Sequence, residues 1–134
     1  MATSHVLGGL PFDEKSGSAT IGTGNVDVDD PTKYKVMGRF NDLGAGVYIV
    51  HGNIEFMPAA SGTTAREIVI SIGIESNKVK YGYTRIRETN NSKASLEHTA
   101  LIRLEGAETV TLYGASSVVA GSACPFKLSA VKLA

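Results

Sequence analysis

Residues 66–76 read REIVISIGIES, and this stretch decides the class of fold. Every second position carries an isoleucine: Ile68, Ile70, Ile72 and Ile74. The positions between them carry Glu67, Val69, Ser71, Gly73 and Glu75. Side chains of a β-strand point alternately to its two faces, and β-branched residues fit a pleated surface well. The stretch therefore predicts a half-buried strand, with the isoleucines on its buried face.

The same period of two extends on both sides of this stretch. In GVYIVHGNIEF, residues 46–56, Tyr48, Val50, Ile54 and Phe56 alternate with Ile49, His51, Asn53 and Glu55. In TVTLYGA, residues 109–115, Val110 and Leu112 share one face. The stretches at 34–40 (YKVMGRF) and 125–134 (PFKLSAVKLA) are further candidates. Turns rich in Gly, Asn, Asp and Ser separate these stretches, as they separate strands in all-β proteins.

Residues 92–106, SKASLEHTALIRLEG, fit either a helix or a strand. Leu96, Ala100 and Leu104 are spaced four apart, which suits a helix, but apolar residues also occupy alternate positions. We favour a strand, because the neighbouring segments are strands and the run ends in a turn that contains Gly106.

The chain of 134 residues has the length of one domain, and its 15 glycines suit many short strands joined by tight turns. About eight strands follow one another at intervals of roughly 8–14 residues, which is typical of a sandwich or jelly roll. The sequence therefore predicts an all-β protein, a single jelly-roll β-sandwich of about eight strands over residues 34–134.

Residues 1–33 differ in composition and predict an extended N-terminal arm. They are rich in Gly, Ser, Thr and Asp and show no sustained period of 2 or 3.6. Four apolar residues are the candidate anchors by which the arm holds a partner: Val6, Leu7, Leu10 and Phe12. The alternative is that these residues pack on their own domain.

Charge and cysteine content restrict the classes of function and partner that we expect. Lys and Arg number 13 and Asp and Glu number 13, whereas proteins that bind nucleic acid normally carry a basic excess. No segment has the pattern of a signal peptide or a membrane span, so we expect synthesis in a cytoplasm and no membrane partner. The single cysteine, Cys124, excludes an intrachain disulfide. We expect no cofactor.

The stretch KVKYGYTRIR, residues 78–87, is the candidate binding surface. Alternation along a strand places Val79, Tyr81, Tyr83, Arg85 and Arg87 on one face. Rings and cations in this arrangement can hold single-stranded nucleic acid. Because the net charge is zero, we favour a solvent-facing strand, which a partner could contact.

Acidic residues and histidines give no clear chemical site. Asp27, Asp29 and Asp30 lie close together, but Asp30 and Val36 stand where a calcium-binding EF-hand loop needs Gly and an acidic residue. We favour a turn here over an irregular calcium site. The histidines are His5, His51 and His98, which lack the spacing of metal ligands. No catalytic motif is present, so we expect no enzyme.

The strand pattern resembles the jelly roll of tumour-necrosis-factor and complement-type globular heads over residues 34–134. Gly46 and Tyr48 match the family's G-x-Y strand. Its A-L-x-L-x-x-G-[DE]-x-V-x-L hairpin is matched, with one insertion, by Ala100, Leu101, Arg103, Leu104, Gly106, Val110 and Leu112. The resemblance implies a homotrimer around a three-fold axis. Members of this family bind receptors or sugars, or serve as structural knobs.

Within this family the chain resembles a small bacteriophage capsid decoration, or cement, protein. That resemblance implies a structural role on the virion surface, with the major capsid protein of the shell as partner and no chemistry. The alternative is a receptor- or glycan-binding knob of a phage fibre or similar adhesin.

Overall fold

The computed structural model describes residues 3–7, 10–24, 26–27, 29, 34–58, 66–76, 79–88, 93–118 and 120–134. These residues form strands and contain no helix, so none of them lies in a helix that could cross a membrane. The strands are β1 (Thr3–Leu7), β2 (Leu10–Ala19), β3 (Gly22–Thr23), β4 (Lys35–Leu43), β5 (Gly46–Phe56), β6 (Arg66–Ile74), β7 (Val79–Glu88), β8 (Ala94–Leu104), β9 (Glu108–Ser116) and β10 (Cys124–Lys132).

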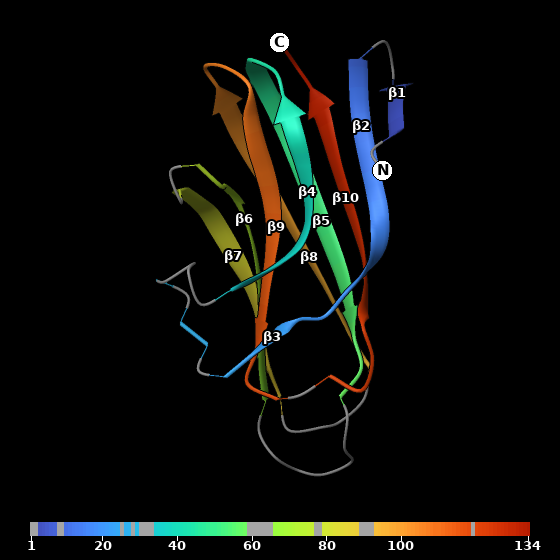
Figure 1. Ribbon diagram of the computed structural model, residues 1–134, viewed down its shortest axis with the longest axis vertical. Coiled ribbons are helices and arrows are strands. Elements are labelled where there is room, and N and C mark those ends of the chain that lie inside the picture. Colours follow the sequence, from blue (N-terminus) through green and yellow to red (C-terminus); the bar gives the residue numbers. More distant parts are fainter. Residues whose placement is uncertain are drawn as a thin grey trace.

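Two sheets pack face to face (Figure 1). Sheet A has the order β1-β2-β10-β5-β8, and sheet B has the order β3-β9-β6-β7 with β4 also paired to β9. Every pairing is antiparallel except the short one between β3 and β9. The architecture is the predicted jelly-roll β-sandwich. The ambiguous segment is the strand β8, as favoured.

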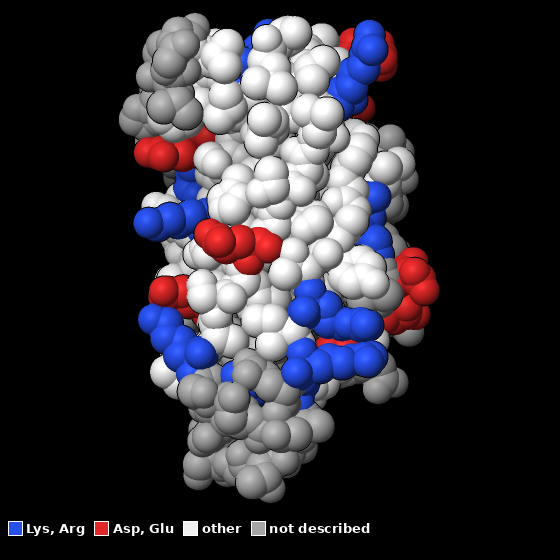
Figure 2. All heavy atoms as spheres, turned by 180° about the vertical axis from the view of Figure 1, so that it is seen from behind, with Lys and Arg blue, Asp and Glu red and all other residues white. Residues whose placement is uncertain are grey.

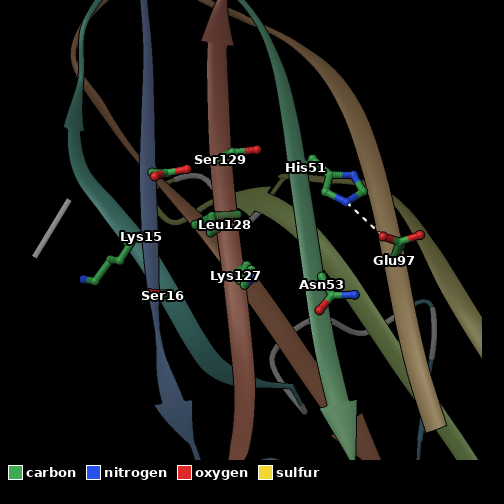
Figure 3. Close-up of a pocket in the computed structure, with 9 residues that line it drawn as sticks. Lys15, Ser16, His51, Asn53, Glu97, Lys127, Leu128 and Ser129 are labelled. Atoms are coloured by element: carbon green, nitrogen blue, oxygen red, sulfur yellow. Dashed lines mark ion pairs between the residues drawn. The ribbon is translucent and has the colours of Figure 1, made fainter. Parts of the chain in front are cut away.

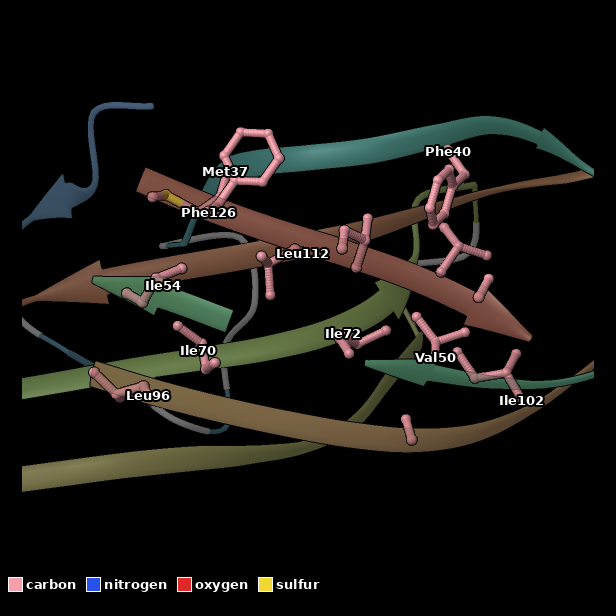
Figure 4. Close-up of a cluster of buried hydrophobic side chains, with 14 of the residues drawn as sticks. Met37, Phe40, Val50, Ile54, Ile70, Ile72, Leu96, Ile102, Leu112 and Phe126 are labelled. Atoms are coloured by element: carbon pink, nitrogen blue, oxygen red, sulfur yellow. The ribbon is translucent and has the colours of Figure 1, made fainter. Parts of the chain in front are cut away.

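The core lies between the sheets and follows the period of two (Figure 4). The isoleucine face of β6 is buried, and so are the even-numbered residues of β5 from Tyr48 to Phe56. Gly52 of β5 faces Leu112 of β9 so closely that a Cβ at Gly52 would lie 2.6 Å from Leu112 Cδ1. The two sheets therefore come together over a glycine at this point.

The second face of β6 is buried, where the sequence predicted a wetter face. Val69 and Ser71 on this face are both 0% exposed. A second apolar cluster covers Val69, formed with Tyr34 and Tyr113 and flanked by the half-buried Val36. Alternation within β6 cannot reveal this cover, because the covering residues come from other segments.

The described part of residues 1–33 contains three strands, so the described residues form ten strands in all, where the sequence predicted about eight. The strand β2 pairs with β10 from Phe12 to Ala19 and thus belongs to sheet A. The strand β1 pairs with β2 at the edge of the same sheet.

Candidate functional site

The outer face of sheet A carries side chains in rows that run across its strands. Cross-strand pairing places Phe12, Val131, Ile49 and Leu101 side by side on β2, β10, β5 and β8. We call these four residues the apolar row. Leu101 is 65% exposed and Ile49 39% exposed, so the β8 end of the row stands furthest into solvent. Seen from behind, the molecule shows mostly uncharged side chains over its upper and middle part, with an acidic group near the centre and basic side chains toward the lower right (Figure 2).

Below the apolar row, the same face is hollowed into a polar groove of about 500 Å³ (Figure 3). Its lining includes His51 and Asn53 of β5, Glu97 of β8 and Lys127 of β10. The Nε2 atom of His51 lies 3.5 Å from a Glu97 carboxylate oxygen, and its Nδ1 atom lies 2.7 Å from Thr99 Oγ1. The groove therefore presents charges of both signs, beside the small side chains of Ser16 and Ser129.

His51 contacts the Thr99 hydroxyl on one side and the Glu97 carboxylate on the other, which is the order of groups in a nucleophilic triad. Glu97 is 67% exposed, so no buried pocket strengthens the interaction. The strand β5 is paired on both sides, to β10 and β8, so its backbone amides are not free to stabilise an oxyanion. We read these contacts as cross-strand pairs on a polar surface.

The candidate binding stretch forms β7, and one prediction about its faces was wrong. Between the pairs Ser71–Tyr83 and Gly73–Lys80, β7 has one residue more than β6, which is a β-bulge. Gly82 sits in this bulge with φ +73°, a conformation that favours glycine. Because of this extra residue, the side chains before Gly82 point to the opposite faces from those that simple alternation along β7 predicts. Tyr81 therefore packs against the core, whereas Tyr83 is 42% exposed on the outer face.

The outer face of β7 combines cations and rings around one carboxylate. Glu67 of β6, only 20% exposed, pairs with Arg87 at 3.0 Å and with Arg85 at 3.5 Å. The Tyr83 ring centroid lies 5.6 Å from Lys80 Nζ and 5.9 Å from Arg85 Cζ. Both distances fall within the range of cation–π contacts. We call Glu67, Lys80, Tyr83, Arg85 and Arg87 the β7 cluster.

Tyr34 lies next to this cluster and was missed by sequence reasoning. Its ring centroid is 5.8 Å from Lys80 Nζ, and its side chain is only 6% exposed. Its hydroxyl is buried and has no hydrogen-bond partner in the described part of the chain. Burial, with smaller contributions from Asp27 and Glu67, raises the pKa of Tyr34 to about 12. The hydroxyl therefore keeps its proton at neutral pH and can donate a hydrogen bond.

His98, one of the three histidines that lack the spacing of metal ligands, links the two sheets at their β7–β8 edge. Its Nε2 donates to the carbonyl of Tyr81 at 2.7 Å, because a carbonyl can only accept. Its Nδ1 then accepts from the Thr84 hydroxyl at 3.1 Å. His98 faces the core side of sheet A and His51 the outer side, so the two histidines do not share a site.

The other predicted site residues are spread over the molecule. Leu10 is 37% exposed in β2, and Phe12 belongs to the apolar row. The structure describes Val6 and Leu7 only as backbone of β1. Asp29 donates its backbone N–H to the Asp27 carboxylate at 3.0 Å, which is a turn contact.

Asp30 lies outside the described residues. Among the residues described, no group of three acidic, histidine or cysteine side chains could hold a metal ion. Cys124 is buried, and burial raises the pKa of its thiol, which makes it a poor nucleophile.

Comparison with solved structures finds this fold in the globular domain of the zebrafish complement 1qA protein. The TM-score is 0.59 at 11% sequence identity, over 93% of this chain and 98% of that chain. Eiger TNF from S. frugiperda gives a TM-score of 0.48 at 14% identity, over 99% of this chain and 91% of that one. Murine APRIL gives 0.49 at 13% identity, over 71% and 72%. No protein-family model and no curated protein matches the sequence.

The chain thus has the jelly-roll fold of complement-type globular heads, as the sequence resemblance implied. At 11% identity the likeness extends to the fold alone.

Proposed function

We propose that the protein is a non-enzymatic structural domain that assembles as a homotrimer through the outer face of sheet A. The apolar row is the observation that carries this proposal. It crosses four strands, and Leu101 and Ile49 leave 65% and 39% of their surface in water. Burial of apolar surface contributes about 25 cal/mol per Å². A neighbouring subunit that covers the row therefore gains stability from it.

Two further features favour sheet A over sheet B as the interface. The chain covers the centre of the outer face of sheet B, around Val69, with Tyr34 and Tyr113, and leaves the apolar row of sheet A uncovered. The adjoining groove carries Glu97 at one end of a cross-strand row and Lys127 near the other. Opposite charges at the two ends of one surface make that surface complementary to a second copy of itself in a rotational assembly.

The particular role that we propose is decoration of a virus shell, as in a bacteriophage cement protein, with the major capsid protein as partner. The edge of sheet A supports it. The strand β1 pairs only with β2 among the described strands, and an unpaired strand edge can accept a neighbouring chain. The exposed Leu10 lies in β2 beside this edge. A decoration protein stabilises a shell because it binds the assembled form alone.

The first test is the mass in solution, by light scattering behind a sizing column. We expect about 42 kDa for the wild type, three times 14.1 kDa. Leu101→Glu should give a monomer, because it places a charge in the apolar row. Met57→Glu is the matched control. Met57 is also an exposed apolar residue, at 47%, but lies outside the row. A monomeric wild type, or a Leu101→Glu variant that remains a trimer, would refute the interface.

The second test separates shell decoration from the rival role of a receptor- or glycan-binding knob. The trimer is mixed with purified phage shells from the source host and sedimented. We expect it to co-sediment at saturable occupancy and to raise the temperature at which the shells fall apart. A trimer that does not sediment with shells, but binds to the surface of host cells, would refute shell decoration and identify a receptor-binding knob.

A further inference from the structure

The β7 cluster has an excess of positive charge that the proposed trimer does not use. It contains Lys80, Arg85 and Arg87 against the one carboxylate of Glu67, so its net charge is +2 (3 − 1) in a chain whose net charge is zero. Within the described part of the chain, Lys80 forms no ion pair, and its Nζ lies within cation–π distance of the rings of Tyr34 and Tyr83. An excess of cations on one strand favours anions, and Asp27, which lies close enough to raise the pKa of Tyr34, offsets part of that excess.

The cations of the cluster are held in place before any ligand arrives. Glu67 binds Arg85 through one carboxylate oxygen and Arg87 through the other. Each guanidinium keeps further N–H donors for a ligand, because it has five. The Tyr83 ring lies between Lys80 and Arg85 in sequence and within cation–π distance of both. Fixed side chains lose less entropy on binding, which favours affinity.

Tyr34 supplies a second and independent observation. Its buried hydroxyl has no hydrogen-bond partner among the described residues, and an unpaired buried hydroxyl costs free energy, so a ligand that accepted a hydrogen bond from it would gain affinity. Its ring lies against Lys80, at 5.8 Å from Nζ. An anion bound by Lys80 can accept a hydrogen bond from the Tyr34 hydroxyl once the lysine side chain moves aside.

We propose that the β7 cluster, together with Tyr34, binds the sulfate or carboxylate groups of an acidic saccharide. Arg85 and Arg87 are two residues apart on one strand face, which spaces them at about 7 Å. Two neighbouring anionic groups of one saccharide chain can therefore bind Arg85 and Arg87 at the same time. The exposed Tyr83 ring adds an apolar edge against which a sugar ring can pack.

Two other anionic partners fit the cluster less well. A single-stranded nucleic acid needs bare ring faces for its bases, whereas Tyr83 is already flanked by Lys80 and Arg85. An acidic peptide that added itself as a strand would have to pair with β7, and the bulge at Gly82 interrupts that strand.

The test is calorimetric titration of the purified protein with a heparin hexasaccharide. We expect saturable binding that weakens with salt, and no binding of the same hexasaccharide after desulfation. Lys80→Gln and Arg87→Gln should each weaken binding by about tenfold, as loss of a charge-assisted contact does. Arg103→Gln is the matched control, because it removes one positive charge from an exposed side chain outside the cluster.

Tyr34→Phe separates a binding role from a structural one. Removal of an unpartnered hydroxyl should leave the protein at least as stable to urea but weaken hexasaccharide binding severalfold. Equal losses in Lys80→Gln and Arg103→Gln would overturn the proposal. So would tighter binding of single-stranded DNA or of polyglutamate. The monomeric Leu101→Glu variant should bind as well per subunit as the wild type, so this site and the sheet A interface can fail separately.

Discussion

Gly52 marks a point where the two sheets leave no room for a side chain. A Cβ there would lie 2.6 Å from Cδ1 of Leu112, which is 0% exposed and has no solvent to move into. The φ of Gly52 lies outside the left-handed region, so alanine suits the backbone and the cost comes from packing alone. We expect Gly52→Ala to lower the free energy of unfolding by about 1–3 kcal/mol.

A double mutant tests this reasoning. Leu112→Ala alone should lower the free energy of unfolding by about 2–5 kcal/mol, because it leaves a cavity. In Gly52→Ala/Leu112→Ala, the new methyl group at residue 52 occupies part of the vacated space. The double mutant should therefore be more stable than the sum of the single effects predicts, by about 1 kcal/mol or more.

The assay is urea unfolding at one fixed protein concentration, since the apparent stability of an oligomer depends on concentration. Gly52→Ala combined with Val69→Ala is the control, because Val69 lies on the other face of sheet B and should give additive effects. If the Gly52/Leu112 pair is also additive to within about 0.5 kcal/mol, the close contact does not exist.

Three further predictions concern single side chains. Tyr34→Phe should raise the free energy of unfolding at pH 7 by about 1 kcal/mol, because none of the described residues forms a hydrogen bond with the buried hydroxyl. Since burial raises the pKa of Tyr34 to about 12, the folded state holds this proton more tightly than the unfolded state. The stability of the wild type should therefore fall between pH 10 and 12 relative to that of the Phe variant, as urea titrations at each pH can show. His98→Ala should lower the free energy of unfolding by about 1–3 kcal/mol, because it leaves the Tyr81 carbonyl and the Thr84 hydroxyl without their partner. An unchanged Tm in this variant would show that His98 does not link the two sheets. Gly46→Ala should lower the Tm, because φ +152° at this glycine strains other residues, and native stability in this variant would contradict the backbone geometry.

The sequence predicts the inner face of the sandwich well, because a period of two is a local property. The alternating isoleucines of β6 and the even-numbered residues of β5 are buried as expected. The cover over Val69 could not be predicted, since it depends on Tyr34 and Tyr113 from other strands and segments.

The outer face of β7, the candidate binding surface, was predicted only in part. Arg85, Arg87 and Tyr83 share the outer face, but the bulge at Gly82 turns Tyr81 toward the core. A bulge depends on the register with the neighbouring strand, and a single sequence shows no register. The glycine between the two tyrosines was the one local signal.

The strand order of sheet A has a consequence for how the chain folds. The strand β10 lies between β2 and β5, so the contacts that close this sheet join residues near opposite ends of the sequence, such as Phe12 and Val131. Such a high contact order makes folding slow, because a long loop must close before its contacts form. During synthesis, the edges of β2 and β5 that pair with β10 stay unpaired until β10 leaves the ribosome. The interval before that moment is when the chain is most exposed to aggregation.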